Sequence, residues 1–233
     1  KWFIKILNKG VLIMSGIFLM VLSAVVAFAG TAVLGKFMIP WLHKLKFGQT
    51  ILDIGPSWHK NKQGTPTMGG MMFIIGIIFA VVVALTACKL GNFSAFASLD
   101  VTRYQQYTRL FSGILMAFCF SLVGFADDYI KVVKKRNLGL TEIQKTIPQV
   151  LIIGAYFASL VISESTSMYI PFYGKVAFDS IPGIIFFCIF GVCVTYGAIN
   201  AVNFTDGIDG LCGSVTIPVG VAFTVMAVLQ QNT

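Results

Sequence analysis

Residues 181–201 read IPGIIFFCIFGVCVTYGAINA, and this stretch contains no charged side chain. A helix of about 20 apolar residues is long enough to cross the hydrocarbon core of a bilayer, which is roughly 30 Å thick. Further apolar runs predict spans near residues 11–34, 68–87, 110–126, 147–162 and 211–229. The sequence therefore predicts an all-α, polytopic membrane protein with six transmembrane helices in this chain.

The composition agrees with a membrane protein. Hydrophobic residues make up 57% of the chain, charged residues only 11%, and the mean hydropathy is +0.85. A soluble domain carries about 25% charged residues, so too few polar side chains remain to cover a water-facing surface. We therefore expect the spans of this protein to be surrounded by the lipid bilayer. The net charge of +8 does not indicate a nucleic-acid partner, because the basic residues lie in loops between the spans.

Those basic residues predict the orientation. Loops 35–67 and 127–146 contain five Lys or Arg residues each, whereas the alternating loops contain three and one. The positive-inside rule places the two basic loops in the cytoplasm. Lys1, Lys5 and Lys9 then lie outside, against that rule, where their spacing suits an interfacial helix.

The outer loop from Glu164 to Asp179 contains aromatic and β-branched residues around Tyr173-Gly174. This composition predicts a short hairpin or an interfacial loop. The sequence shows no internal repeat, low-complexity tract or linker. We therefore expect residues 1–233 to form a single membrane-embedded domain.

Two adjacent acids follow the third predicted span, in the stretch GFADDYIKVVKKRN. Asp127 and Asp128 repel one another, so one of them would be driven to protonate unless a cation intervenes. A solvated helix end is the alternative, but it would normally use one acid, or an acid with a base. Lys131 follows Asp127 by four residues and Asp128 by three, on the same helical face.

A second polar group lies after the fifth predicted span, in NAVNFTDGIDGL. Asn200, Asn203, Asp206 and Asp209 recur at every third residue, which on a helix or 3₁₀ turn gathers them on one stripe. Carboxylates and amide oxygens are hard ligands that suit Mg²⁺.

A third stretch, HKNKQGTPTMGG at residues 59–70, precedes the second predicted span. It supplies two lysines, two threonines and a Gly69-Gly70 pair whose backbone N–H groups would be open to an anion at a helix start. By itself this pattern is equally typical of an ordinary membrane loop.

Topology places all three stretches at the cytoplasmic face. Together they suit phosphoryl transfer, in which positioning and charge neutralisation supply most of the rate.

The segments KNKQGTPTMGG, FADDYIKVVKK and NAVNFTDGIDGL closely resemble the signatures of the phospho-N-acetylmuramoyl-pentapeptide transferases. These enzymes belong to the polyprenyl-phosphate N-acetylhexosamine-1-phosphate transferases. The resemblance covers nearly the whole chain in order and spacing. It implies Mg²⁺-dependent transfer of phospho-MurNAc-pentapeptide from UDP-MurNAc-pentapeptide to undecaprenyl phosphate, which gives lipid I and UMP in peptidoglycan biosynthesis. It also implies the bacterial inner membrane, with the active site facing the cytoplasm, and leaves a homodimer open.

The resemblance also implies roles for individual residues. The catalytic set comprises Asp127, Asp128, Asp206 and Lys131, and the three aspartates are also the candidate metal ligands. The substrate-binding set comprises Lys62, Thr67, Lys145, Asn200, Asn203, Phe204 and Asp209.

The chain departs from the family in its length. Members have about ten spans, and the C-terminal third, with a further essential aspartate and a histidine-rich loop, has no counterpart here. His43 and His59 do not match that loop. We therefore expect these 233 residues to need the missing third for activity.

Two other functions stay open: a sister enzyme that uses UDP-GlcNAc, and an ion-coupled transporter with intramembrane acids.

The orientation can be tested by cysteine labelling. A cysteine in place of Arg136 should resist an impermeant thiol reagent added outside intact cells, because its loop is predicted to be cytoplasmic. A cysteine in place of Lys175 is the matched control and should react quickly. Both are introduced after the five native cysteines have been replaced. Rapid external labelling at position 136 would overturn the topology.

Overall fold

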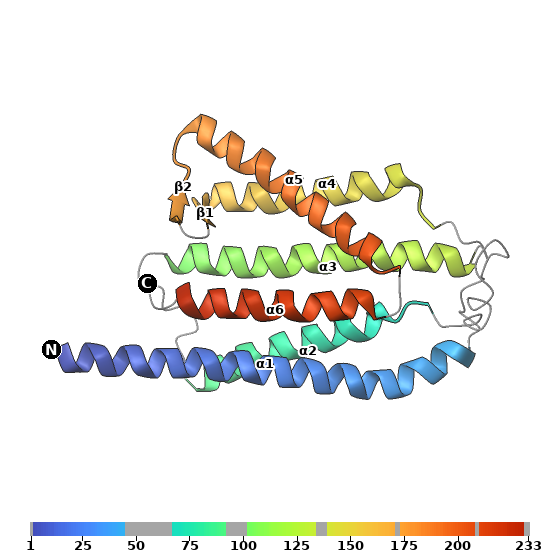
Figure 1. The fold of residues 1–233 in the computed structure, drawn as a ribbon, viewed down its shortest axis with the longest axis horizontal. Coiled ribbons are helices and arrows are strands. Elements are labelled where there is room, and N and C mark those ends of the chain that lie inside the picture. The colour runs from blue at the N-terminus through green and yellow to red at the C-terminus, as the bar shows by residue number, and fades with distance from the viewer. Residues whose placement is uncertain are drawn as a thin grey trace. The chain divides into compact units, whose positions relative to one another are not determined.

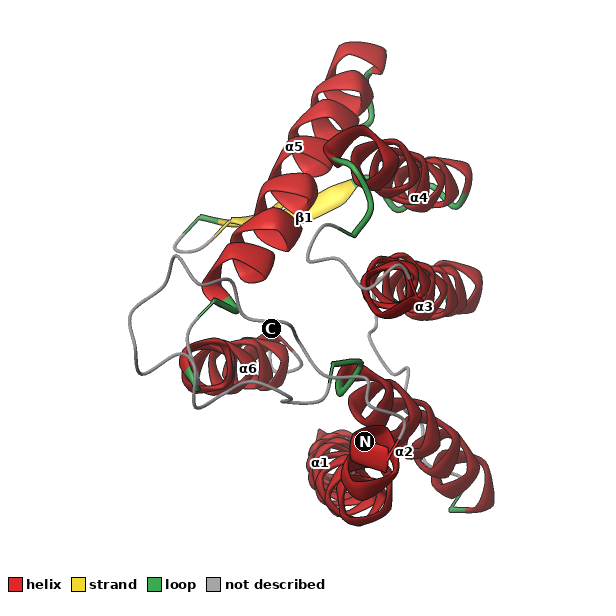
Figure 2. Ribbon diagram, turned by 90° about the vertical axis from the view of Figure 1, so that its right-hand side faces the viewer, coloured by secondary structure: helices red, strands yellow, loops and turns green. Residues whose placement is uncertain are grey.

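The computed structural model describes residues 2–44, 67–91, 102–133, 139–170, 173–207 and 210–230. In this part of the chain, helices dominate and a single two-stranded hairpin interrupts them (Figures 1 and 2). The elements are α1 (Trp2–Lys44), α2 (Gly70–Leu90), α3 (Arg103–Val133), α4 (Glu142–Ile162), β1 (Ser167–Ile170), β2 (Gly174–Ala177), α5 (Ile181–Thr205) and α6 (Leu211–Gln230).

The predicted all-α membrane fold is confirmed. Five helices are long and apolar enough to cross a bilayer, and α6 contributes a shorter apolar segment, Leu211–Ala227. Large hydrophobic side chains are exposed along these helices, as lipid-facing surfaces require. The spans lie within Gly16–Lys44, Gly70–Leu90, Tyr104–Val133, Glu142–Ile162 and Ile181–Thr205.

The helices extend further than the predicted spans. α1 has 43 residues, which at about 1.5 Å per residue makes it roughly twice as long as the hydrocarbon core is thick. The N-terminal residues expected to form an interfacial helix continue directly into the first span. Lys36 and Asp127, which the sequence places in loops, lie inside α1 and α3. A helix continues into water until a residue stops it, so hydropathy underestimates its length.

Local hydrogen bonds define where α3 and α4 begin. Before α3, Thr102 N–H donates to Gln105 Oε1 at 3.1 Å, and Gln105 N–H donates to Thr102 Oγ1 at 3.3 Å. Thr141 and Gln144 repeat this exchange before α4, at 3.0 and 3.4 Å. Each pair is a capping box, which satisfies N–H groups that have no partner inside the helix.

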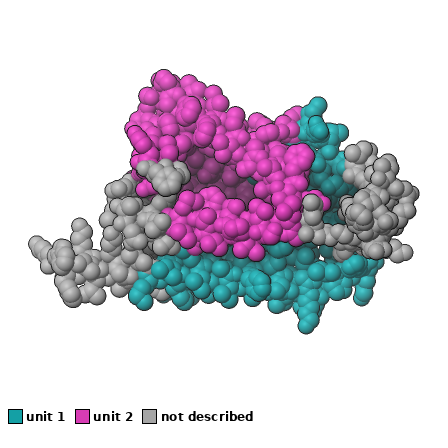
Figure 3. Space-filling model, in the orientation of Figure 1, with its two compact units in different colours: residues 1–97, 120–145 teal, residues 98–119, 146–233 magenta. Residues whose placement is uncertain are grey.

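The chain divides into two compact units, residues 1–97 with 120–145 and residues 98–119 with 146–233 (Figure 3). In the first unit, α1 and α2 lie side by side and antiparallel. They meet at two glycines, where the Gly76 Cα lies 3.8 Å from the position that a Cβ on Gly30 would occupy. A Cβ on Gly76 would overlap the Thr31 hydroxyl. Small residues at such contacts let membrane helices approach closely.

Aromatic side chains form the centre of the second unit. Phe157 of α4 and Phe187 of α5 are buried, and their rings meet edge to face with centroids 5.4 Å apart. Gly191 of α5 makes room for the Phe157 ring, which a Cβ would overlap. The pair α4 and α5 is therefore held by ring packing against a glycine.

The hairpin that the outer loop predicts is confirmed. β1 and β2 pair antiparallel, with Ile170 opposite Gly174. Gly174 has a φ of +105°, a conformation that glycine adopts without steric cost. Thr166 and Phe178 extend the pairing, because Phe178 N–H donates to Thr166 O at 2.8 Å and Thr166 Oγ1 donates to Phe178 O at 2.9 Å.

The α1–α2 contact predicts a difference between two glycine variants. Alanine in place of a helical glycine normally favours the helix by about 1 kcal/mol. Gly154→Ala in α4 should therefore be neutral or stabilising, because nothing lies within 4 Å of its Cβ. Gly76→Ala should lower the thermal unfolding midpoint in detergent, because its Cβ overlaps Thr31. Equal midpoints for the two variants would show that α1 and α2 do not meet at Gly76.

Candidate active site

The acid pair near the end of α3 lies in a cluster of opposite charges in the first unit. Lys131 Nζ lies 2.7 Å from Asp127 Oδ2 and 3.2 Å from Asp128 Oδ1. The spacing of four and three residues along α3 predicts these contacts. One lysine therefore bridges both carboxylates and reduces their repulsion.

Asp127 has two further partners, which come from the segment after α3. Lys145 Nζ, in the first turn of α4, lies 3.0 Å from Asp127 Oδ1. The backbone N–H of Leu140 donates to the same oxygen at 2.7 Å. The Asp127 side chain is 12% exposed, whereas those of Lys131 and Lys145 are 33% and 32% exposed. The carboxylate is thus largely enclosed, and the two ammonium groups remain accessible.

The charges within the cluster balance. Two carboxylates face two ammonium groups, and the Leu140 amide adds a neutral donor. A buried carboxylate without partners would carry a large desolvation cost. An anionic substrate could compete for the lysines, because a phosphate offers them the same kind of acceptor.

The second polar group lies at the end of α5, in the second unit. The segment NAVNFTDGIDGL, expected between two spans, is helical as far as Thr205. This correction has a local cause, since the first glycine after Asn200 is Gly207. Asp206 forms the C-cap, with its N–H donating to Val202 O at 3.1 Å. Asn203, Phe204 and Asp206 are all exposed, so their side chains are available to a ligand.

Asn200 differs from the other members of that stripe. Its carboxamide donates to Tyr196 O at 2.9 Å and, at 3.5 Å, to Oε1 of the buried Gln149 on α4. Nearby, Thr146 Oγ1 and the Tyr196 hydroxyl lie 3.1 Å apart. These residues form a polar contact between α4 and α5, so Asn200 has a structural role there.

Of the third stretch, only residues 67–70 are described, and Thr67 is half-buried just before α2. Met68 has a φ of +71°, and Gly69 is the N-cap without a side-chain hydrogen bond. The expectation of open N–H groups at the Gly69-Gly70 pair stays a prediction. The two residues that follow the pair have partners within the first turn. Met71 and Met72 donate to Met68 O and Gly69 O at 3.2 and 3.1 Å, because the first turn closes on itself. Lys62 and Asp209 lie outside the described residues.

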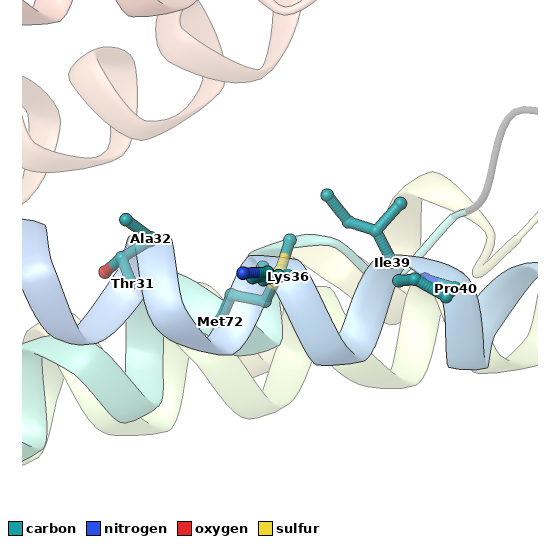
Figure 4. A pocket seen from close by; sticks show the side chains of 7 residues that line it. Thr31, Ala32, Lys36, Ile39, Pro40 and Met72 are labelled. Carbon is teal, nitrogen blue, oxygen red and sulfur yellow. The ribbon is translucent and has the colours of Figure 1, made fainter.

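A shallow groove of about 540 Å³ runs along α1 (Figure 4). Lys36 is its one charged lining residue, and Pro40 and Met72 border it. Pro40 has no N–H with which to bond the Lys36 carbonyl inside the helix. The groove contains no member of the acid–lysine cluster, so it is separate from that site.

Comparison with known proteins identifies the family. The sequence profile of glycosyl transferase family 4 matches residues 110–233, slightly more than half of the chain. The chain belongs to glycosyl transferase family 4. The match includes the acid–lysine cluster and the end of α5.

Curated relatives carry a more specific name. The phospho-N-acetylmuramoyl-pentapeptide-transferase of Bacillus mycoides (strain KBAB4) is 40% identical over 215 residues, 91% of this chain and 60% of the relative. Those of Desulforamulus reducens and Heliobacterium modesticaldum are each 39% identical and cover 89% of this chain. In each of these two, the match covers 58% of the relative. This family 4 chain thus spans about 60% of the length of the curated relatives it matches.

The carboxylates fit a divalent cation in part. Mg²⁺ is usually held by one or two carboxylates together with substrate phosphates. Both Asp127 oxygens already accept N–H donors, whereas Asp128 Oδ2 accepts none from any residue that the structure describes. Within the same residues, no three acidic, histidine or cysteine side chains gather. Asp128 can therefore offer an oxygen directly, and Asp127 only after a lysine has moved.

Sequence reasoning missed Gly139 and Leu140, whose backbone reaches Asp127. Leu140 acts through its amide, which every residue except proline has, so its side chain gives no signal. It also missed Thr146, Gln149 and Tyr196, which meet only when α4 and α5 pack. The Thr-x-x-Gln capping box directly after Gly139-Leu140 is the one visible sign that a defined turn lies there.

The role of Asn200 can be separated from that of Asn203. Asn200→Ala should lower the thermal unfolding midpoint in detergent, because Gln149 loses a partner between membrane helices, a contact worth about 0.6–1.7 kcal/mol. Asn203→Ala, on the exposed part of the same helix, should leave the midpoint unchanged. If both variants unfold like the unsubstituted protein, the contact between α4 and α5 does not depend on Asn200.

Proposed function

We propose that the protein transfers phospho-MurNAc-pentapeptide from its UDP carrier to undecaprenyl phosphate, with release of UMP, in peptidoglycan biosynthesis. This proposal rests on one observation, the cluster near the C-terminal end of α3 that contains Asp127, Asp128, Lys131 and Lys145. Membership of glycosyl transferase family 4 and the names of the curated relatives support the same reaction class.

The chemistry requires an anionic acceptor to attack an anionic donor. Asp127 accepts a proton from the lipid phosphate or orients it, and a phosphate oxygen then attacks the β-phosphorus of the UDP-sugar. The bond between the β-phosphorus and the bridging oxygen breaks, and UMP leaves with that oxygen. Attack by the Asp127 carboxylate, through an aspartyl-phosphate, is the two-step alternative.

The lysines supply the positive charge that this reaction needs. Lys131 and Lys145 are about one-third exposed, so each can turn from Asp127 towards an incoming diphosphate. A lysine ammonium is a mobile point charge on a flexible stem, which suits such an exchange. Once they are paired with phosphate oxygens, the two ammonium groups would stabilise the charge that develops in the transition state.

We further propose that the reaction depends on Mg²⁺. Among the described acids of the first unit, Asp128 has an oxygen that accepts no hydrogen bond from the described residues and could hold the ion together with substrate phosphates. When bound, the ion would supply charge neutralisation at the UMP leaving group. At the end of α5, the exposed Asp206 is the other candidate carboxylate.

The substrate location follows from the topology. Successive spans cross the membrane in opposite directions. The side that carries the basic loops is therefore expected to hold the C-terminal ends of α3 and α5 and the N-terminal ends of α2, α4 and α6. We propose that this is the cytoplasmic face of the bacterial inner membrane, where UDP-linked sugars are found. The uridine pocket is proposed to include Lys62, Thr67, Asn203, Phe204 and Asp209.

Donor choice tests the proposed function. The complete protein, supplied with undecaprenyl phosphate and Mg²⁺, should release UMP from UDP-MurNAc-pentapeptide and not from UDP-GlcNAc. Release from UDP-GlcNAc alone would assign the sister reaction. Release from neither donor would contradict a transferase and favour the transporter hypothesis.

The same assay tests the role of Asp127. Asp127→Asn should lower turnover by at least about a hundredfold, the usual scale for the loss of a general acid or base. Binding of UMP by calorimetry is the control, because a folded variant should keep its nucleotide affinity. Near-normal turnover in a folded variant would remove Asp127 from the reaction.

A further inference from the structure

Gly139 approaches Asp127 so closely that no side chain fits between them. A Cβ on Gly139 would overlap Asp127 Oδ1, and it would lie 2.7 Å from the carboxyl carbon and 2.9 Å from the backbone carbonyl oxygen. Gly139 itself is buried. Its φ is not positive, so the glycine is required by this approach and not by an unusual backbone conformation.

The approach brings one backbone donor onto the carboxylate. Leu140 N–H donates to Asp127 Oδ1 at 2.7 Å, at the short end of the range for such bonds. The capping box of Thr141 and Gln144 follows directly and ties this segment to the start of α4. The amide is therefore fixed by a helix terminus, whereas the two ammonium groups sit at the ends of flexible side chains.

The difference between the fixed amide and the flexible ammonium groups determines which donors stay on Asp127 when substrate binds. Under the proposed function, Lys131 and Lys145 turn towards phosphate oxygens, and each then leaves an Asp127 oxygen. The Leu140 amide offers its proton to no substrate group while it is bonded to Oδ1. Of the three described donors to Asp127, it is the one that can hold the carboxylate in place throughout the exchange.

We propose that Gly139 is a positioning residue, which acts by letting the Leu140 amide reach the Asp127 carboxylate. With any larger residue, either the Asp127 side chain or the segment that carries the amide must shift, and the hydrogen bond from Leu140 to Asp127 is broken or lengthened. This inference rests on the proposed function for its catalytic consequence, but the contact itself can be tested without any activity.

Kinetics test the catalytic consequence. In the complete protein, Gly139→Ala should lower kcat for UMP release by about a hundredfold, the scale expected for a misplaced catalytic group. The KM values for both substrates should stay within about twofold, because ground-state binding does not depend on this donor. Gly124→Ala on α3 is the matched control, since nothing lies within 4 Å of its Cβ. A kcat equal to that of the control, or a loss confined to KM, would overturn the proposal.

Stability tests the contact independently. Gly139→Ala should lower the unfolding midpoint in detergent, and it should lower it less in an Asp127→Ala background, which lacks the carboxyl group that the new Cβ would overlap. The Asp127 backbone oxygen stays 2.9 Å from that Cβ in both backgrounds, so part of the loss remains. If Gly139→Ala does not fold, the double variant should restore folded protein. Equal losses in both backgrounds, or no restoration, would overturn the inference. A protein that releases no UMP but shows this rescue would contradict the proposed function alone.

Discussion

The arrangement of the first unit depends on the enclosed carboxylate of Asp127. A charge near the end of a membrane helix needs partners, and here they come from three places: the next turn of α3, the first turn of α4, and the backbone just before α4. Gly139 and Leu140, just before α4, therefore lie against Asp127 of α3. Gly139 allows the close approach, and the Thr141–Gln144 capping box defines where α4 begins. Electrostatic compensation thus determines the local path of the chain.

Elsewhere, the helices are held together by close packing. The hydrophobic effect does not drive their association in a bilayer, because lipid tails are as apolar as the helix surfaces. Between α1 and α2 the contact is made by glycines and Thr31, and between α4 and α5 by Phe157 against Gly191. A few hydrogen bonds, such as that from Asn200 to Gln149, add specificity to the second contact. Small residues and isolated polar pairs are the expected means of helix association in a bilayer.

In the proposed function, the acid–lysine cluster would be stable without substrate and able to bind a phosphate. Its balanced charges avoid the cost of an unpaired buried ion, and the same lysines are exposed enough to meet a phosphate. In that proposal, the Leu140 amide positions the carboxylate, and the mobile ammonium groups neutralise the phosphate charge. The family 4 profile covers this cluster and the end of α5, where Asn203, Phe204 and Asp206 are exposed.

The sequence by itself determined the membrane class, the approximate spans and the pairing of Lys131 with both acids, because hydropathy and helical periodicity act over short distances. It gave the hairpin as one of two alternatives for the outer loop. It also indicated the family through three motifs. It did not determine the true helix ends, the structural role of Asn200 or the closed first turn of α2. The Leu140 amide and the Gly139 approach came only from the tertiary structure. A backbone N–H donor cannot be recognised from the sequence, because every residue except proline has one. The need for a glycine arises only when another segment comes within contact distance.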